Sequence, residues 1–345
     1  AQLIPIIRRF KEGSHDLKLF SPATLKDLEG VVEDQGWVEW GKVRARRWSL
    51  RGAGLDIDYY EDTDRRPVMV EMAARKLRAI REGLETAVQT PPMKEIPLPE
   101  GVVESEVTFV SGTLTLAGSL ARPATGEKIP GVVLLSDSGP QDRNGDLALL
   151  KAIAYRLSRD GVAVLRYDDR GIGGSQGDVS RIRWSELVQD ASAAMAYLRA
   201  REEVDGARVG MIGHGEGGGV ASVVAERDEN LRALFLLGGA GKPWDEIMLD
   251  RMGLRLRKAG TGEEQRLAIL AGQRKTFEKI KSGSGEMMVI DEKETFVAGL
   301  REHFRHDPAI QIPKIGSTVV VFQGLKDEQI SPENGDLLES TMKKA

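Results

Sequence analysis

The strongest constraint on the fold is an alternation of apolar runs with amphipathic stretches that begins near residue 102. A short, continuous apolar run is typical of a strand that is buried on both faces. The predicted strands lie at residues 131–135, 161–167, 208–212, 233–237 and 318–322. Helical patterns separate the first four of them, at residues 147–159, 184–199 and about 218–226. Strands that alternate with helices form a mainly parallel sheet with helices on both faces, so an α/β domain is predicted over residues 100–345.

Two segments of this domain depart from the alternation. Residues 102–110 and 113–120 are predicted to form an opening hairpin, because a Ser-Gly turn joins two strand-like stretches. Residues 243–312 are charged and helical in pattern. Because they lie between two predicted strands, we expect an inserted helical cap over the carboxyl edge of the sheet.

The first 95 residues have a different texture. Short alternating stretches predict strands at residues 37–50, 55–61 and 67–72, and residues 73–86 have the pattern of a helix. A proline-rich segment at residues 90–97 is typical of a stiff linker. Residues 1–95 are therefore predicted to form a small α+β accessory domain.

The composition excludes several classes of function. The 345 residues include 49 basic and 53 acidic residues, so the net charge of −4 does not indicate a nucleic-acid partner. There is no cysteine, which excludes disulfides and thiolate metal sites. No apolar run approaches the roughly 20 residues that span a bilayer, and the N-terminus lacks the pattern of a signal peptide. We expect no membrane association, no metal, no cofactor and a cytoplasmic location; because the chain begins with Ala1, it can also be a piece of a longer protein.

The loop after the 208–212 strand reads Gly-His-Gly-Glu-Gly at residues 213–217. A sharp strand-to-helix turn needs small residues two positions before and two after its apex, and Gly213 and Gly217 stand there. The apex is the place for a nucleophile that attacks a carbonyl carbon, but Gly215 has no side chain. A glycine-rich turn for phosphate binding or for simple packing explains this loop alone equally well.

Three neighbouring loops resolve that choice. They lie at the carboxyl ends of predicted strands and read SDSGPQDR at 136–143, YDDRGIGGS at 167–175 and QGLKDEQI at 323–330. Together with the 213–217 loop they resemble the α/β-hydrolase superfamily, in its bacterial esterase and serine-aminopeptidase-like (S33-type) branch. That branch carries the motifs SGSGPQDR, GHSEG and YDxRGxGxS. The resemblance covers about residues 100–345, and it implies hydrolysis of a small ester or amide that binds in a cleft under the cap.

The resemblance also assigns roles to individual residues. It places Gly215 at the nucleophile position, the backbone N–H groups of Ser138 and Glu216 in the oxyanion hole, and Asp327 at the acid of the triad. This sequence also departs from the family motif at Asp137, which stands where the family has glycine. A carboxylate at that position would repel a developing oxyanion. The side chain of Glu216, one residue from the apex, is not expected to act as the nucleophile.

The histidines of this chain do not supply the general base that the triad requires. The triad order requires a histidine after Asp327, and none follows it in this sequence. We expect the hydrolase domain to be incomplete at its C-terminus, and His303 and His306 to be surface residues of the cap. Arg143 and Arg170 are predicted to form structural salt bridges.

Two functions remain in competition. The first is an esterase-type hydrolase. We expect this chain to be an inactive member, because it lacks both the nucleophile and the general base of acyl transfer. The second is a non-catalytic binding or scaffold protein that keeps the cleft. The sequence leaves open whether Gly215 and the absent histidine reflect lost activity, an introduced change or an incomplete chain.

Overall fold

The computed structural model describes residues 14–21, 26–40, 43–52, 55–72, 77–84, 96–145, 148–290 and 293–343. The chain divides into two compact units, one formed chiefly by residues 1–94 and the other chiefly by residues 95–345. The predicted linker at residues 90–97 lies largely outside the described residues.

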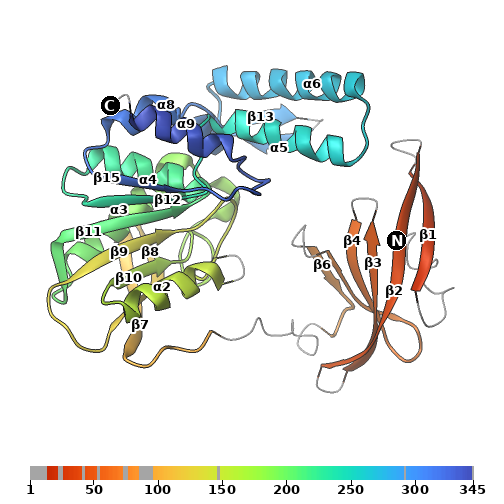
Figure 1. Ribbon diagram of the computed structural model, residues 1–345, viewed down its shortest axis with the longest axis horizontal. Coiled ribbons are helices and arrows are strands. Elements are labelled where there is room, and N and C mark those ends of the chain that lie inside the picture. The colour runs from red at the N-terminus through yellow and green to blue at the C-terminus, as the bar shows by residue number, and fades with distance from the viewer. Residues whose placement is uncertain are drawn as a thin grey trace. The chain divides into compact units, whose positions relative to one another are not determined.

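The first unit contains an antiparallel sheet of six strands in sequential order, drawn in red to orange in Figure 1. Its strands are β1 (Ser14–Ser21), β2 (Lys26–Trp40), β3 (Val43–Gly52), β4 (Leu55–Glu61), β5 (Pro67–Met72) and β6 (Leu77–Ile80). Aromatic and apolar side chains of β3 to β5 form its core, among them Trp48, Tyr59 and Met69.

The helix predicted at residues 73–86 is wrong where the structure describes it. Residues 77–80 form the edge strand β6, whose Ile80 pairs with Met69 of β5. Leucine, alanine and arginine favour a helix, but this preference is weak, and ladder hydrogen bonds to β5 outweigh it. The described part of residues 1–94 is therefore a β-sheet and not the expected α+β domain.

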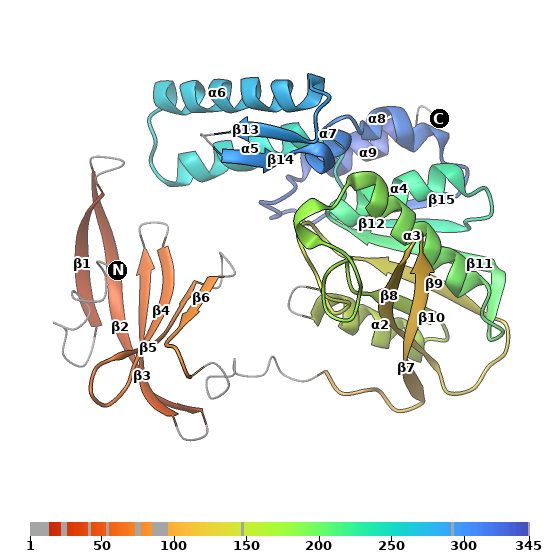
Figure 2. The same cartoon turned by 180° about the vertical axis from the view of Figure 1, so that it is seen from behind.

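The second unit is built on a seven-stranded sheet in the order β15-β12-β11-β9-β10-β8-β7. Its strands are β7 (Val102–Ser111), β8 (Leu114–Pro123), β9 (Ile129–Leu135), β10 (Ala163–Tyr167), β11 (Val204–His214), β12 (Ala233–Leu237) and β15 (Thr318–Phe322). From β10 to β15 all neighbours are parallel, whereas β7 and β8 form the predicted antiparallel hairpin. The predicted α/β-hydrolase fold, a mainly parallel sheet between helices, is confirmed (Figure 2).

The apolar runs are continuous because both faces of the central strands are covered. Val133 of β9 lies in a core that includes residues of α3 (Trp184–Arg199) and α4 (Glu216–Arg227). The next residue, Leu134, lies in a second core with α2 (Leu149–Arg159). Successive side chains of a strand point to opposite faces, so neither face can be polar.

The insertion between β12 and β15 is mixed rather than wholly helical. It contains α5 (Trp244–Lys258), α6 (Glu263–Ser282), β13 (Met287–Ile290), β14 (Lys293–Phe296), α7 (Ala298–Phe304), α8 (Pro308–Gln311) and η4 (Ile312–Lys314). The β13–β14 hairpin was not predicted, because a strand of four residues is too short to display a clear period. After β15 the described chain continues into α9 (Glu333–Met342). None of the helices in the described ranges is both long and apolar enough to cross a membrane.

Candidate active site

The 213–217 loop forms a tight turn between β11 and α4. The strand ends at His214, the helix begins at Glu216, and Gly215 between them has φ 54° and ψ −118°. Its N–H donates to the carbonyl of Leu237 at the end of β12, which anchors the turn. A Cβ atom at Gly213 or Gly217 would overlap neighbouring backbone atoms. The crowding predicted for the two flanking positions is therefore present.

Asp137, in the loop after β9, reaches across to this turn. Its Oδ1 atom accepts a hydrogen bond of 2.7 Å from the N–H of Ser138 and one of 3.1 Å from the N–H of Glu216. These are the two donors that the resemblance assigns to an oxyanion hole, and the structure brings them together on one oxygen atom. Their role as an oxyanion hole stays a prediction.

Asp137 and Gly215 fit each other sterically. A Cβ atom built on Gly215 would overlap Oδ1 and Cγ of Asp137. The positive φ of Gly215 is, in addition, a backbone conformation that residues with a side chain adopt only at a cost. The two departures from the family motif are therefore linked, because this placement of the Asp137 carboxylate requires that residue 215 has no side chain.

Two ion pairs, each with a buried aspartate, hold the surrounding loops. Arg143 donates from Nε to Oδ1 of Asp168 at 3.0 Å and from Nη2 to Oδ2 at 2.8 Å. Arg170 likewise forms a bidentate pair with Asp190 of α3: Nε donates to Oδ2 and Nη2 donates to Oδ1, both at 2.7 Å. Burial raises the pKa of Asp168, but hydrogen bonds from Arg143 and Gly174 outweigh it and hold that pKa below its usual value. The prediction that Arg143 and Arg170 form structural salt bridges is confirmed.

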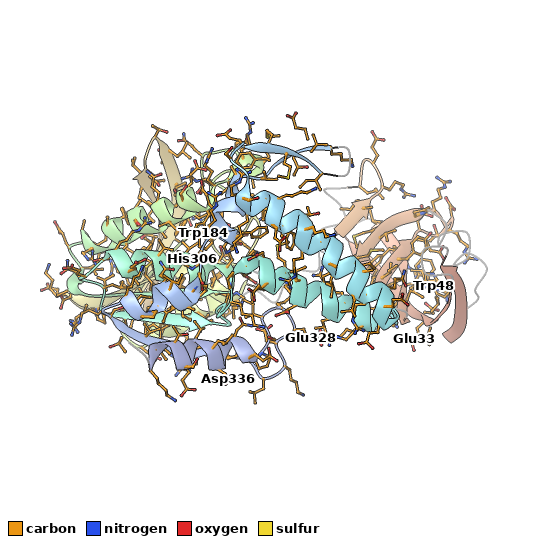
Figure 3. The ribbon with its side chains drawn as sticks, turned by 90° about the horizontal axis from the view of Figure 1, so that it is seen from above. Glu33, Trp48, Trp184, His306, Glu328 and Asp336 are labelled. Carbon is orange, nitrogen blue, oxygen red and sulfur yellow. The ribbon has the colours of Figure 1, made fainter. Side chains whose placement is uncertain are left out.

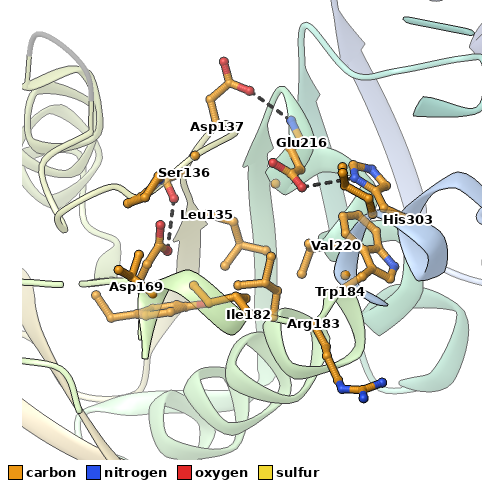
Figure 4. A pocket seen from close by; sticks show the side chains of 18 residues that line it. Leu135, Ser136, Asp137, Asp169, Ile182, Arg183, Trp184, Glu216, Val220 and His303 are labelled. Carbon is orange, nitrogen blue, oxygen red and sulfur yellow. Dashed lines mark hydrogen bonds and ion pairs between the residues drawn. The ribbon is translucent and has the colours of Figure 1, made fainter. Parts of the chain in front are cut away.

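A pocket of about 240 Å³ opens beside the turn (Figure 4). Apolar side chains form most of its wall, including Leu135, Ile182, Trp184, Leu187, Val220 and Leu300. Three acidic residues also line it: Asp137, Asp169 and Glu216. The arrangement suits a small molecule with an apolar body, because such sites combine apolar walls with a few polar groups that orient the ligand.

Asp169 is an acidic group of the pocket whose pKa is raised by its surroundings. Burial raises the pKa of its carboxyl group to about 7, and the negative charges of Glu216 and Asp190 add to this. Hydrogen bonds from the N–H of Gln141, at 2.9 Å, and from Ser136 Oγ, at 3.4 Å, only partly compensate. Asp169 was not singled out from the sequence, where it is one of two adjacent aspartates in a motif; a raised pKa depends on burial that a motif does not reveal.

His303 of α7 is not the surface residue that we expected. Its side chain is 7% exposed, and Nδ1 lies 3.1 Å from Oε1 of Glu216. Its ring is stacked between two tryptophans, 3.9 Å from the Trp184 ring and 4.7 Å from the Trp244 ring, centroid to centroid. The three stacked residues are far apart in the sequence, so no local pattern could have predicted this contact.

His306 is also more enclosed than expected. It lies beside Trp184, with 5.5 Å between ring centroids (Figure 3). Burial lowers the pKa of its imidazole to about 4, with a further contribution from His303. It is therefore neutral at ordinary pH. The expectation of a surface histidine is wrong here too, because the short segment between α7 and α8 that carries it packs against Trp184 of α3.

Asp327 stands in the loop that follows β15, at the carboxyl edge of the sheet. Its Oδ1 atom accepts hydrogen bonds from the N–H groups of Gln329, at 2.8 Å, and Ile330, at 3.0 Å. Its Oδ2 atom faces Gly238, just beyond the end of β12. Asp327 is not among the residues that line the pocket. His303 does line it, but its imidazole pairs with Glu216 and not with Asp327. Its role as a triad acid stays a prediction.

The family described as serine aminopeptidase, S33, matches residues 144–343, which is more than half of the chain. The chain belongs to this family. That membership agrees with the sheet order and with the tight turn between β11 and α4.

Curated relatives of this S33-family chain match parts of it. Esterase EstD of Thermotoga maritima is 27% identical over 245 residues, which are 69% of this chain and 55% of EstD. The quorum-quenching protein AidA of Acinetobacter baumannii is 30% identical over 131 residues, which are 38% of this chain and 42% of AidA. The chain spans about half the length of each of these two relatives. The structure of a hypothetical protein from Pseudomonas aeruginosa aligns with a TM-score of 0.51 and 17% identity, over 73% of this chain and 87% of that one, and shares the fold.

Proposed function

We propose that this chain has the ligand site of an esterase-type hydrolase for a small ester or amide, but does not itself carry out acyl transfer. The pocket beside the turn is the ligand site, with the insertion between β12 and β15 as its cap. Three residues of α7 in that insertion, Gly299, Leu300 and His303, line the pocket and support this assignment.

The observation that carries the proposal is the Asp137 carboxylate at the apex. Acyl transfer needs a nucleophile at residue 215 and two free N–H donors for the oxyanion of the tetrahedral intermediate. Gly215 offers no nucleophile, and both donors, from Ser138 and Glu216, are occupied by Asp137 Oδ1. Three requirements of the reaction are thus unmet at one place.

The same observation favours the second candidate, a binding protein without catalysis. The pocket, the loops and the N–H donors persist, whereas the reacting side chain does not. Serine hydrolases that lose members of the triad retain only the small acceleration that binding and the oxyanion hole supply. Here the hole is filled as well, so we expect less than that residual rate.

The test is hydrolysis of p-nitrophenyl butyrate by the protein and by its Asp327→Asn variant. We expect both to release p-nitrophenol at the rate of buffer alone. Asp336→Asn, on the exposed side of α9, is a matched control, because it removes the same charge away from the pocket. A rate above buffer that falls in Asp327→Asn but not in Asp336→Asn would show an active triad and overturn the proposal.

A further inference from the structure

The Asp137 carboxylate fills the place that an external anion would take. A carboxylate oxygen with two converging N–H donors has the same contacts as the oxyanion of an acyl intermediate or the carboxylate of a hydrolysis product. Both donors converge on Oδ1, at 2.7 Å from Ser138 and 3.1 Å from Glu216. The chain therefore supplies, from its own sequence, the group that this part of the pocket is shaped to hold.

The rest of the pocket offers little to a second anion. Asp169 and Glu216 add carboxyl groups to the lining. The described lining includes one arginine, Arg183, whose guanidinium group pairs with Glu286 and Glu302 and points away from the other labelled side chains (Figure 4). The imidazole of His303 is held by Glu216. A carboxylate ligand would meet like charge without a compensating cation, whereas a neutral ligand would meet apolar walls.

We infer that Asp137 determines the specificity of this pocket, because it closes the oxyanion hole to external carboxylates and leaves the pocket to uncharged ligands. The inference rests on the proposed function in one respect, the assignment of the Ser138 and Glu216 N–H groups as an oxyanion hole. It does not depend on whether the chain catalyses a reaction. Gly215 is part of the arrangement, since a side chain there would displace the Asp137 carboxylate.

The probes are benzoate and benzamide, which have nearly the same size and shape but differ in charge. Their binding to the full chain is measured by chemical-shift titration, for the native protein and for Asp137→Gly. We expect benzamide to bind both proteins with affinities within about threefold of each other. Benzoate should bind Asp137→Gly at least about tenfold more tightly than the native protein, because the vacated N–H groups can then donate two charge-assisted hydrogen bonds.

A second variant separates occupancy from charge. In Asp137→Asn the side-chain carbonyl can still accept from both N–H groups, so benzoate should bind as weakly as it does to the native protein. Unchanged benzoate affinity in Asp137→Gly, with benzamide binding intact, would overturn the inference; so would tight benzoate binding by Asp137→Asn. Ester hydrolysis by the native protein would contradict the proposed function but leave this contrast in binding untouched, so the two failures are distinguishable.

Discussion

Two regions beside the pocket differ: the frame, which is formed by the loops after β9 and β10, and the apex of the turn after β11. The frame carries two ion pairs, Arg143 with Asp168 and Arg170 with Asp190, at positions where the S33-type motifs have the same arginines. The apex differs from those motifs at Gly215 and at Asp137. The ion pairs of the frame hold the loops of the fold together, whereas the apex is where the proposed function places the reacting groups of an active esterase. The comparison therefore separates requirements of the fold from requirements of the reaction.

The physical basis of this difference is the cost of each change. Removing one partner of a buried ion pair leaves a charge without compensation, which destabilises the folded state. Replacing a nucleophile by glycine costs no packing, and here the Asp137 carboxylate satisfies the N–H groups of Ser138 and Glu216. The apex therefore leaves neither of these N–H groups without a hydrogen-bond partner.

The largest effect on stability is expected from removing one partner of the Arg170–Asp190 ion pair in the frame. Arg170 and Asp190 are 5% and 1% exposed. Arg170→Met leaves Asp190 buried without its partner, and we expect the free energy of unfolding to fall by about 3–5 kcal/mol. Urea unfolding measures this. The matched control is Arg156→Met, which removes an arginine from an exposed i,i+4 pair with Asp160 and should leave stability unchanged within error. An equal loss of unfolding free energy in both variants would show that the Arg170–Asp190 pair stabilises the fold no more than an exposed ion pair does.

A second, smaller effect on stability is expected from the opposite pKa shifts of two adjacent aspartates. Asp168, in the frame, has a lowered pKa, whereas the pKa of Asp169, in the pocket, is raised to about 7. A carboxyl group with a raised pKa in the folded state stabilises the protein below its unfolded pKa, and this contribution is lost as the pH rises through the folded pKa. We expect Asp169 to contribute a loss of roughly 2–3 kcal/mol between about pH 5 and pH 8.

The measurement is the difference in unfolding free energy between the native protein and Asp169→Asn across that range. The native protein should lose stability relative to the variant as the pH rises. A difference that stays constant, or a carbon NMR titration of Asp169 with an ordinary midpoint near 4, would contradict the raised pKa.

The frame was more accessible to sequence analysis than the apex. The mainly parallel sheet and the opening hairpin were predicted from apolar periodicity, and the structural salt bridges of Arg143 and Arg170 from their places in motifs. The convergence of Asp137, Ser138 and Glu216 was foreseen only in part. The sequence placed both N–H donors and flagged Asp137 as a source of repulsion, but it could not show that the carboxylate itself accepts their hydrogen bonds.

The failures have a common cause. The enclosure of His303 depends on Trp184 and Trp244, and strand β6 depends on its partner β5. In each case a contact between distant segments outweighs a local preference. Local patterns predicted a helix at residues 73–86 and surface positions for His303 and His306 because they contain no information on those partners.

The central claim is that Gly215 and Asp137 form one linked change, and a double-mutant cycle tests it most directly. Gly215→Ala is introduced into the native protein and into Asp137→Gly, and unfolding free energies are measured for all four proteins. The backbone strain of alanine at φ 54° is common to both backgrounds and cancels. Because only the overlap with the Asp137 carboxylate remains, alanine should cost about 1–2 kcal/mol less when Asp137 is absent. Equal costs in the two backgrounds would contradict the account.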